Sequence, residues 1–215
     1  MSKNKIKNIA FVTAVLALIA LSACATQQGP ILVGAAYEAP QGLEKSPHKV
    51  VVGVSPFQDG RGKKSSLVGE RVDEKGQFEN DLVVQGNVSD LVTAALKEAL
   101  KARGITVKDV PAWDLKIEDL KADGVDIVIG GSVTVLWTKA VAQALNANTR
   151  ADVSLHVVAA DAREKKIVRT LDLNGMYERR ALSFDPDRVG EAISAALSQT
   201  IDQLLNDGDI KKNIQ

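Results

Sequence analysis

Apolar residues recur every three or four positions in two long stretches of the chain, and this spacing predicts two amphipathic helices. The first covers residues 88–100 and ends before Gly104, whose missing side chain suits a helix C-terminus. The second begins after Asp185, which can cap the first turn, with Pro186 where an amide hydrogen is not needed. A shorter helix is expected over residues 115–122.

Alternating or continuous apolar runs predict β-strands around these helices. Val50–Val54 is a β-branched run that suits a buried strand, and further strands are expected at 105–107 and 125–138. Residues 152–159 and 167–174 alternate on either side of a polar turn. The last three strands therefore predict a long antiparallel meander with one buried face.

Two amphipathic helices and a sheet with one apolar face are satisfied together when both helices pack on that face. The predicted fold class is α+β, a two-layer sandwich with a mostly antiparallel sheet and two main helices on one face. This domain is expected to cover residues 48–208, and the polar tail 209–215 is expected to be mobile.

The N-terminus precedes this domain and has a different pattern. Lys3, Lys5 and Lys7 come before the apolar run Ile9–Leu21, which is too short for a comfortable membrane span. A basic segment, an apolar run and small residues together predict a secretory signal. Residues 25–47 contain three prolines and three glycines without apolar periodicity, so 24–47 is interpreted as a flexible tether.

The sequence Leu21-Ser22-Ala23-Cys24 resembles the lipobox of bacterial lipoproteins. The resemblance implies a signal peptide over 1–23 that is cut between Ala23 and Cys24. It further implies diacylglycerol on the Cys24 thiol and an acyl chain such as palmitate on the new amino group. Ala25 stands where an Asp would favour the inner membrane, so the resemblance implies a lipid-anchored, periplasm-facing protein of the outer membrane.

Three segments of the domain resemble the YajG-type lipoproteins and related small periplasmic lipoproteins with an α/β sandwich. They are Ala-Leu-Lys-Glu-Ala-Leu-Lys-Ala-Arg-Gly-Ile at 95–105, Asp-Ile-Val-Ile-Gly-Gly-Ser-Val at 126–133 and Ala-Ala-Leu-Ser-Gln-Thr-Ile at 195–201. The resemblance implies an envelope location and a binding or assembly role, and it supplies no catalytic residues.

Composition and charge limit the classes of partner and cofactor that the chain is expected to bind. The whole chain has 27 basic and 27 acidic residues, and loss of the three lysines in 1–23 leaves a net charge of −3. A mildly acidic chain argues against a nucleic acid partner. One cysteine excludes an internal disulfide framework, and with only two histidines we expect no metal site and no cofactor beyond the lipid on Cys24.

Two segments invite a catalytic interpretation. Gly60–Ser65 is similar to a phosphate-binding loop, but a second lysine separates Gly-Lys from Ser, so a solvated loop is expected. Asp152, Ser154 and His156 share one face of a strand, where neighbouring side chains have roots about 7 Å apart and form no triad. We therefore expect no catalytic residues and no enzyme.

The better candidate is a surface. The second face of the sheet would carry a mixed polar and apolar set that could bind a partner, namely Thr134, Leu136, Ser154, His156, Val158 and Thr170. The long segment 58–87 is another candidate. The favoured function is a non-enzymatic anchored lipoprotein that binds or helps assemble an envelope component. The alternatives are an envelope hydrolase or small-ligand carrier, and an accessory subunit of an envelope secretion or transport complex.

Overall fold

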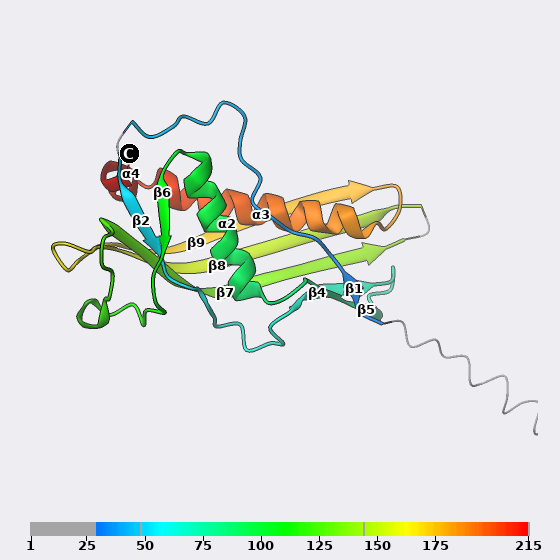
Figure 1. Ribbon diagram of the computed structural model, residues 1–215. Helices are drawn as coiled ribbons and strands as arrows, with labels where there is room; N and C mark the ends of the chain where they lie inside the picture. The colour runs from blue at the N-terminus through cyan, green and yellow to red at the C-terminus, as the bar shows by residue number, and fades with distance from the viewer. Residues whose placement is uncertain (1–28, 48, 144, 215) are drawn as a thin grey trace, which may run out of the picture.

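One curled β-sheet organises the protein (Figure 1). The computed structural model describes residues 29–47, 49–143 and 145–214, so the predicted signal peptide, Ala23, Cys24 and His48 lie outside the described residues. The strands of the described sheet are β1 (Ile31–Leu32), β2 (Val51–Val54), β3 (Gln58–Asp59), β4 (Leu67–Val72), β5 (Phe78–Val83), β6 (Thr106–Asp109), β7 (Ile127–Ala142), β8 (Ala147–Asp161) and β9 (Lys166–Ala181). The helices are α2 (Val88–Ala102), the 3₁₀ turn η1 (Ile117–Asp119), α3 (Pro186–Asn206) and α4 (Gly208–Ile214).

The long strand β7 is the axis of the sheet. Along one edge it pairs antiparallel with β8, which pairs antiparallel with β9, as the predicted meander requires. Along the other edge it pairs in succession with β2, β3 and β4, all parallel to it. The sheet is therefore mixed, and the expectation of a mostly antiparallel two-layer sandwich is corrected. The cause is the connection through α2, which returns the chain so that β6 and β7 run in the direction of β2.

Both long helices cover one face of this sheet, as predicted (Figure 1). Asn87 caps α2 by accepting a hydrogen bond from the Asp90 amide, and Asp185 caps α3 by accepting from the Asp187 amide. Their apolar stripes pack on the inward residues of β7 and β8 and form the main core. The α+β class is thus confirmed, with a curled mixed sheet as its second layer.

The segment before β2 is part of the domain. Ile31 and Leu32 pair with β5, and the next residues follow α3, with Val33 buried. The amides of Ala36 and Glu38 donate to the hydroxyls of two α3 serines at 3.0 and 2.8 Å. The expectation of a flexible tether over 24–47 is therefore corrected for residues 31–38. Extended backbone without apolar periodicity is fixed here by hydrogen bonds and one buried valine.

A buried arginine joins this segment to both long helices. The Arg103 side chain is only 1% exposed, and its Nη2 lies 2.8 Å from Asp202 Oδ1 on α3. Its Nη1 donates to the Tyr37 hydroxyl and to the Ala99 carbonyl, both at 3.1 Å. The Tyr37 hydroxyl donates to the same Asp202 oxygen at 2.8 Å, and burial is the main cause that raises the pKa of Tyr37.

The C-terminal residues form a helix where a mobile tail was expected. In α4, Ile210 and Ile214 are four residues apart, lie on one helix face and are buried in the main core. The Asp207 side chain caps the helix by accepting from the Asp209 and Ile210 amides. The described domain therefore extends to Ile214.

The predicted helix over 115–122 is reduced to the single turn η1. Leu115 has a positive φ of 68°, which a helix excludes. The surrounding loop instead lays Trp113, Leu120 and Val125 on the sheet face opposite the helices, where they cover Val128, Val158 and Ala160. None of the described helices has the length and hydropathy needed to cross a membrane.

Candidate functional site

The predicted partner face was drawn by strict alternation along β7, and a bulge breaks that alternation. Val133 pairs with Leu155 and Val135 pairs with Ser154, so Thr134 is an extra residue. Beyond it the two faces exchange: Leu136 is buried in the main core, while Val135 and Trp137 turn outward. Leu136 therefore does not belong to the accessible face, whereas Val135 and Trp137, which the predicted set did not include, do.

A second correction concerns Val158. It lies on the predicted side of the sheet but is 4% exposed, because the loop carrying Trp113 covers it. Thr170, its cross-strand neighbour on β9, remains exposed. The accessible part of this face therefore lies beside the region that the Trp113 loop covers, on the parts of β7, β8 and β9 nearer the β7–β8 turn. We define the outer face as Thr134, Val135, Trp137, Ser154, His156, Asp172, Asn174 and Met176.

Polar side chains on the outer face are joined across strands. Thr134 Oγ1 donates to the Ser154 carbonyl at 3.1 Å, and Ser154 Oγ lies 2.6 Å from Asn174 Oδ1. His156 Nδ1 lies 2.7 Å from Asp172 Oδ1. Four of the six predicted residues are thus accessible, and three of them belong to this network. It offers donors and acceptors to a polar partner.

The His156–Asp172 pair bears on the hydrolase alternative. A histidine held by a carboxylate is one part of a catalytic triad. However, the Ser154 hydroxyl is engaged by Asn174, and the pair lies on an open sheet face with the Asp172 side chain 83% exposed. Sequence reasoning placed His156 with Asp152 and missed Asp172. Counting from the polar turn at 161–165 would place residue 170 opposite His156, whereas the observed pairing, with its register shift between Ala159 and Ala160, brings Asp172 there instead, so the turn position alone could not have found the pair.

An aromatic and a cation extend the outer face. Lys63 Nζ lies 4.3 Å from the centre of the Trp137 ring, so the loop between β3 and β4 reaches the sheet surface beside β7. Val135 and Met176 are exposed on the same face, and Met176 lies one strand beyond the residue opposite Trp137. Apolar and aromatic groups therefore flank the polar network.

The loop that resembled a phosphate site is held by its own arginine. The Arg61 side chain is 2% exposed. Its Nε lies 2.8 Å from Asp59 Oδ1, and its Nη2 lies 2.8 Å from Asp59 Oδ2. Its Nη1 donates to the Leu67 carbonyl at 2.6 Å and to the Leu136 carbonyl at 3.2 Å. The hydrogen bond from Arg61 is the main cause that lowers the pKa of Asp59. Arg61 thus shapes the loop and is not free to bind an anion.

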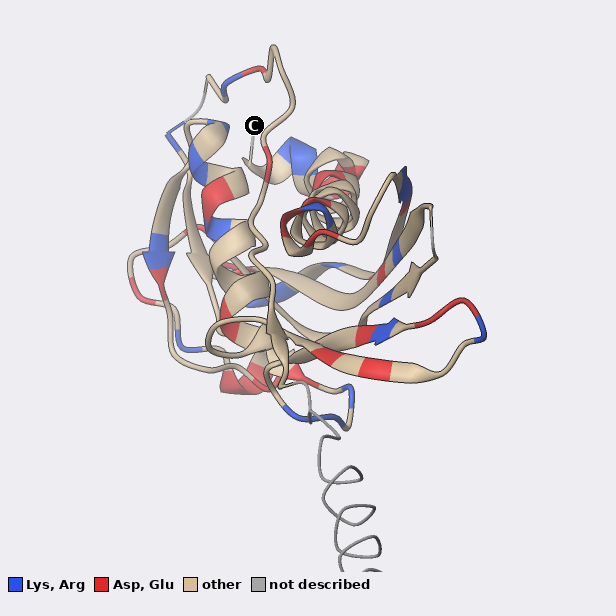
Figure 2. Ribbon diagram, turned by 90° about the vertical axis from the view of Figure 1, so that its right-hand side faces the viewer, with Lys and Arg blue, Asp and Glu red and all other residues tan. Residues whose placement is uncertain are grey.

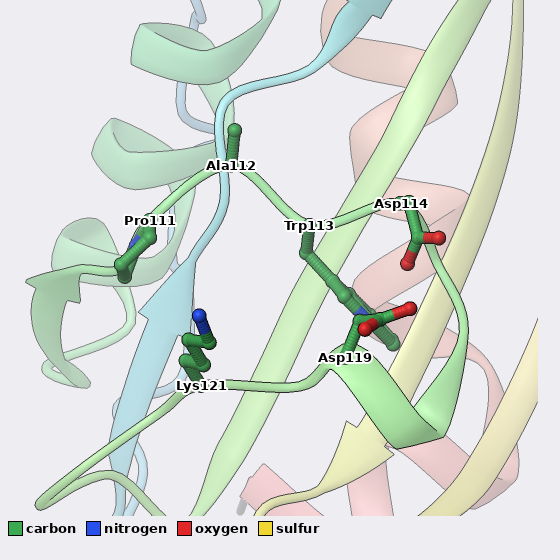
Figure 3. Close-up of a pocket in the computed structure, with 6 residues that line it drawn as sticks. All are labelled: Pro111, Ala112, Trp113, Asp114, Asp119 and Lys121. Carbon is green, nitrogen blue, oxygen red and sulfur yellow. The ribbon is translucent and has the colours of Figure 1, made fainter.

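A small pocket of about 240 Å³ lies in the loop before η1 and is lined by Pro111, Ala112, Trp113, Asp114, Asp119 and Lys121 (Figure 3). The indole Nε1 of Trp113 donates to the Lys116 carbonyl at 2.6 Å, and its amide donates to Ser55 Oγ. The tryptophan therefore anchors the loop. The lining contains no histidine, cysteine or serine that could act as a nucleophile or an uncharged base.

No group of three or more His, Cys, Asp or Glu side chains in the described ranges is arranged to hold a metal ion.

The sequence matches no protein-family model and no curated protein. The chain is similar to several solved structures, to different degrees. A Xanthomonas campestris protein assigned to the family DUF330 has a TM-score of 0.54 at 13% identity, over 83% of this chain and 92% of that one. A neuraminyllactose-binding hemagglutinin homolog from Helicobacter pylori has a TM-score of 0.40 at 10% identity, over 82% and 95%. A Neisseria meningitidis lipoprotein has a TM-score of 0.29 at 18% identity, over 74% and 99%. The first of these likenesses shows a shared fold.

Proposed function

We propose that this chain is a lipid-anchored protein of the bacterial cell envelope that binds or helps assemble another envelope component and catalyses no reaction. Its anchor would be diacylglycerol on Cys24, with palmitate or a similar acyl chain on the amino group left by cleavage after Ala23. It would face the periplasm from the outer membrane.

The carrying observation is the sequence Leu21-Ser22-Ala23-Cys24 behind a basic and apolar leader, followed closely by the folded domain. Six residues separate Cys24 from Ile31, where the chain enters the sheet. Two or more acyl chains anchor a protein stably, because each buried methylene contributes about 0.8 kcal/mol. The protein would therefore be held directly at the membrane.

The outer face supports a binding role. Trp137, Val135 and Met176 flank a hydrogen-bonded polar network, and interfaces between proteins are enriched in aromatic residues and methionine. The His156–Asp172 pair supports hydrolysis less well, because the nearby serine is bonded elsewhere. We therefore propose the outer face as the surface that meets the partner.

The anchor is tested by metabolic labelling with palmitate in cells that produce the wild-type chain or Cys24→Ala. Label in the wild type alone, with the protein in the outer-membrane fraction of a density gradient, is the expected result. Equal labelling of both chains would disprove the anchor. Label confined to the wild type in the inner-membrane fraction would contradict only the outer-membrane location.

The binding surface is tested by placing a photo-crosslinking amino acid at Val135 in living cells. Glu164, exposed on the β8–β9 turn, is the matched control position. We expect a discrete crosslinked envelope protein from position 135 and none from position 164. Identification of transporter or secretion subunits would support the accessory-subunit alternative, and an absence of crosslinks at 135 would contradict the proposed surface.

A further inference from the structure

The register of the sheet brings three chain reversals to one end of the protein. Val72, at the end of β4, pairs with Val141, which pairs with Asn148, which pairs with Arg180. The β4–β5 hairpin, the β7–β8 turn and the β9–α3 connection therefore lie side by side at this end, which faces the viewer in Figure 2. We call it the turn end.

The turn end displays large apolar side chains on its reversals. Leu182, between β9 and α3, is 90% exposed, Leu145 in the β7–β8 turn is 83% exposed, and Phe78 at the start of β5 is 61% exposed. Isolated exposed leucines are common, but here each of three neighbouring reversals carries one large apolar residue. Each reversal at this end therefore carries or adjoins an exposed large apolar residue.

The opposite end of the same meander has the reverse character. Residues 141–149, which contain the β7–β8 turn, include no charged residue, and neither does 181–184. The β8–β9 turn at the far end, 161–166, has five charged residues out of six. The two ends of one antiparallel hairpin system thus differ sharply in charge, although both are exposed.

The chain enters the domain from the turn end. β1 runs parallel to β5, with Ile31 opposite Leu82, and Asn80 donates from Nδ2 to the Gly29 carbonyl at 3.1 Å. Because β5 begins at Phe78 at the turn end, β1 runs away from that end, and Gly29 lies on the side of β1 that is nearer to it. Five residue steps separate Gly29 from Cys24, so the two Cα atoms can be at most about 18 Å apart.

We propose that the turn end is a membrane-contacting surface, on which Leu145 and Leu182 enter the boundary between lipid headgroups and acyl chains. This inference rests on the proposed lipid anchor at Cys24. Strands lie about 4.8 Å apart, so β1 and β9, five strand spacings apart, are separated by about 24 Å. A bilayer held within about 18 Å of Gly29 is continuous over that distance and would extend across the turns. The proposed anchor would itself place a bilayer next to the turn end, so we take the bilayer as the partner of this surface.

The charges near the two leucines fit this orientation. Asp73, Glu74 and Lys75 are at the tip of the β4–β5 hairpin, so this hairpin would stay among the headgroups while the uncharged turns insert. Interfacial apolar groups are buried roughly 5–10 Å deep, which a leucine on a protruding turn can reach. The lipid chains and the two leucine turns would then hold the domain in one orientation.

The test uses the full lipidated protein in vesicles of phosphatidylethanolamine and phosphatidylglycerol. The Cys24 thiol is blocked by its thioether, so Leu145→Cys and Leu182→Cys each add one free thiol for an environment-sensitive NBD fluorophore. Glu164→Cys, on the charged turn at the far end, is the matched control. The exposure of all three positions leaves the fold undisturbed by the label, which circular dichroism verifies.

We expect doxyl-labelled lipid to quench the fluorophore at positions 145 and 182 at least about twofold more than at 164, as insertion near the acyl chains requires. Aqueous iodide should quench position 164 more strongly. Flotation of the vesicles tests the anchor separately. If the protein fails to float, the proposed anchor and this inference both fall. If it floats while 145 and 182 stay open to iodide, the anchor stands and the membrane-contacting surface is disproved.

Discussion

At the scale of single residues, two buried arginines hold together segments that lack regular structure. Arg61 and Arg103 are each paired with a carboxylate, and their other N–H groups donate hydrogen bonds to backbone carbonyls or to a tyrosine hydroxyl. The planar guanidinium has five donors in a fixed arrangement, so one side chain can satisfy several acceptors at once. Arg61 fixes the loop after β3 in this way, and Arg103 fixes the segment before β2.

The Asp59–Arg61 pair predicts a pH dependence. Because Arg61 lowers the folded-state pKa of Asp59 below its ordinary 3.8, the pair stabilises the fold fully above pH 3.8 and loses this effect as the pH falls through the lower folded value. Asp59→Asn should reduce the free energy of unfolding at pH 7 by about 2 kcal/mol and flatten the acid decline. Urea unfolding between pH 2 and about 7 measures both.

Asp114, an exposed carboxylate whose Oδ2 lies 3.4 Å from the exposed Lys116 Nζ, is the control for that experiment. Asp114→Asn should change the free energy of unfolding by less than about 0.5 kcal/mol and leave its pH dependence as in the wild type. An unchanged acid decline in Asp59→Asn would contradict the role assigned to the pair.

At the scale of elements, the pattern of the sequence predicted what depends on neighbours within one element. The stripes of α2 and α3 and the alternation of β8 are such cases, and all are confirmed. The bulge at Thr134 is a property of the β7–β8 pair, and no signal in β7 alone marks it. Consequently the sequence placed Leu136 on the wrong face and left Val135 and Trp137 out of the candidate surface.

The pairing of the strands also could not be predicted from the pattern of apolar residues. β7 pairs with β2, β3 and β4 across long sequence separations. An apolar run predicts a buried strand, but it does not show whether the neighbouring strand is parallel or antiparallel. The short helix expected at 115–122 failed for a related reason, since its apolar residues cover a second sheet face as a loop. Tertiary contact decided each of these elements.

The contact between α3 and the N-terminal segment predicts a sharp effect at Gly190. A Cβ atom at this position would lie 2.0 Å from the Gly34 carbonyl oxygen, and both atoms belong to backbones that cannot yield separately. Gly190→Ala should therefore lower the free energy of unfolding by about 2 kcal/mol or more, although alanine favours the helix by about 1 kcal/mol. It should also speed proteolytic cleavage of residues 31–38.

Gly208→Ala is the matched control, because α4 begins there and no atom lies within 4 Å of the added Cβ. We expect this variant to be as stable as the wild type or slightly more stable. If Gly190→Ala behaves like Gly208→Ala in urea unfolding and proteolysis, the close approach of α3 and residue 34 is not required for folding.

At the scale of the whole molecule, the domain is one body from Ile31 to Ile214. The N-terminal segment pairs with β5 and lies along α3, and Arg103 ties it to α2 and α3 at once. The C-terminal helix α4 closes the same core with Ile210 and Ile214. The proposed lipid on Cys24 would be separated from Ile31 by six residues, so covalent geometry would constrain the orientation of the domain at the membrane.

Because the N-terminal segment contacts β5, α2 and α3, we predict that it stabilises the domain. A chain that starts at Ala39 loses the buried side chain of Val33, worth about 2 kcal/mol, and exposes two serine hydroxyls whose hydrogen bonds contribute about 1 kcal/mol each. Compared with a chain that starts at Gly29, it should unfold at lower urea concentration, with a free energy reduced by about 4 kcal/mol.

Tryptophan fluorescence follows the transition, because Trp113 is buried and Trp137 lies on the sheet. Tyr37→Phe in the longer chain is a graded control: it removes one hydroxyl between Arg103 and Asp202 and should cost about 1 kcal/mol. A tether independent of the fold would leave the urea midpoint unchanged in both variants. That result would mean that residues 31–38 contact α3 without contributing to stability, and that the distance between the proposed anchor and the domain could vary.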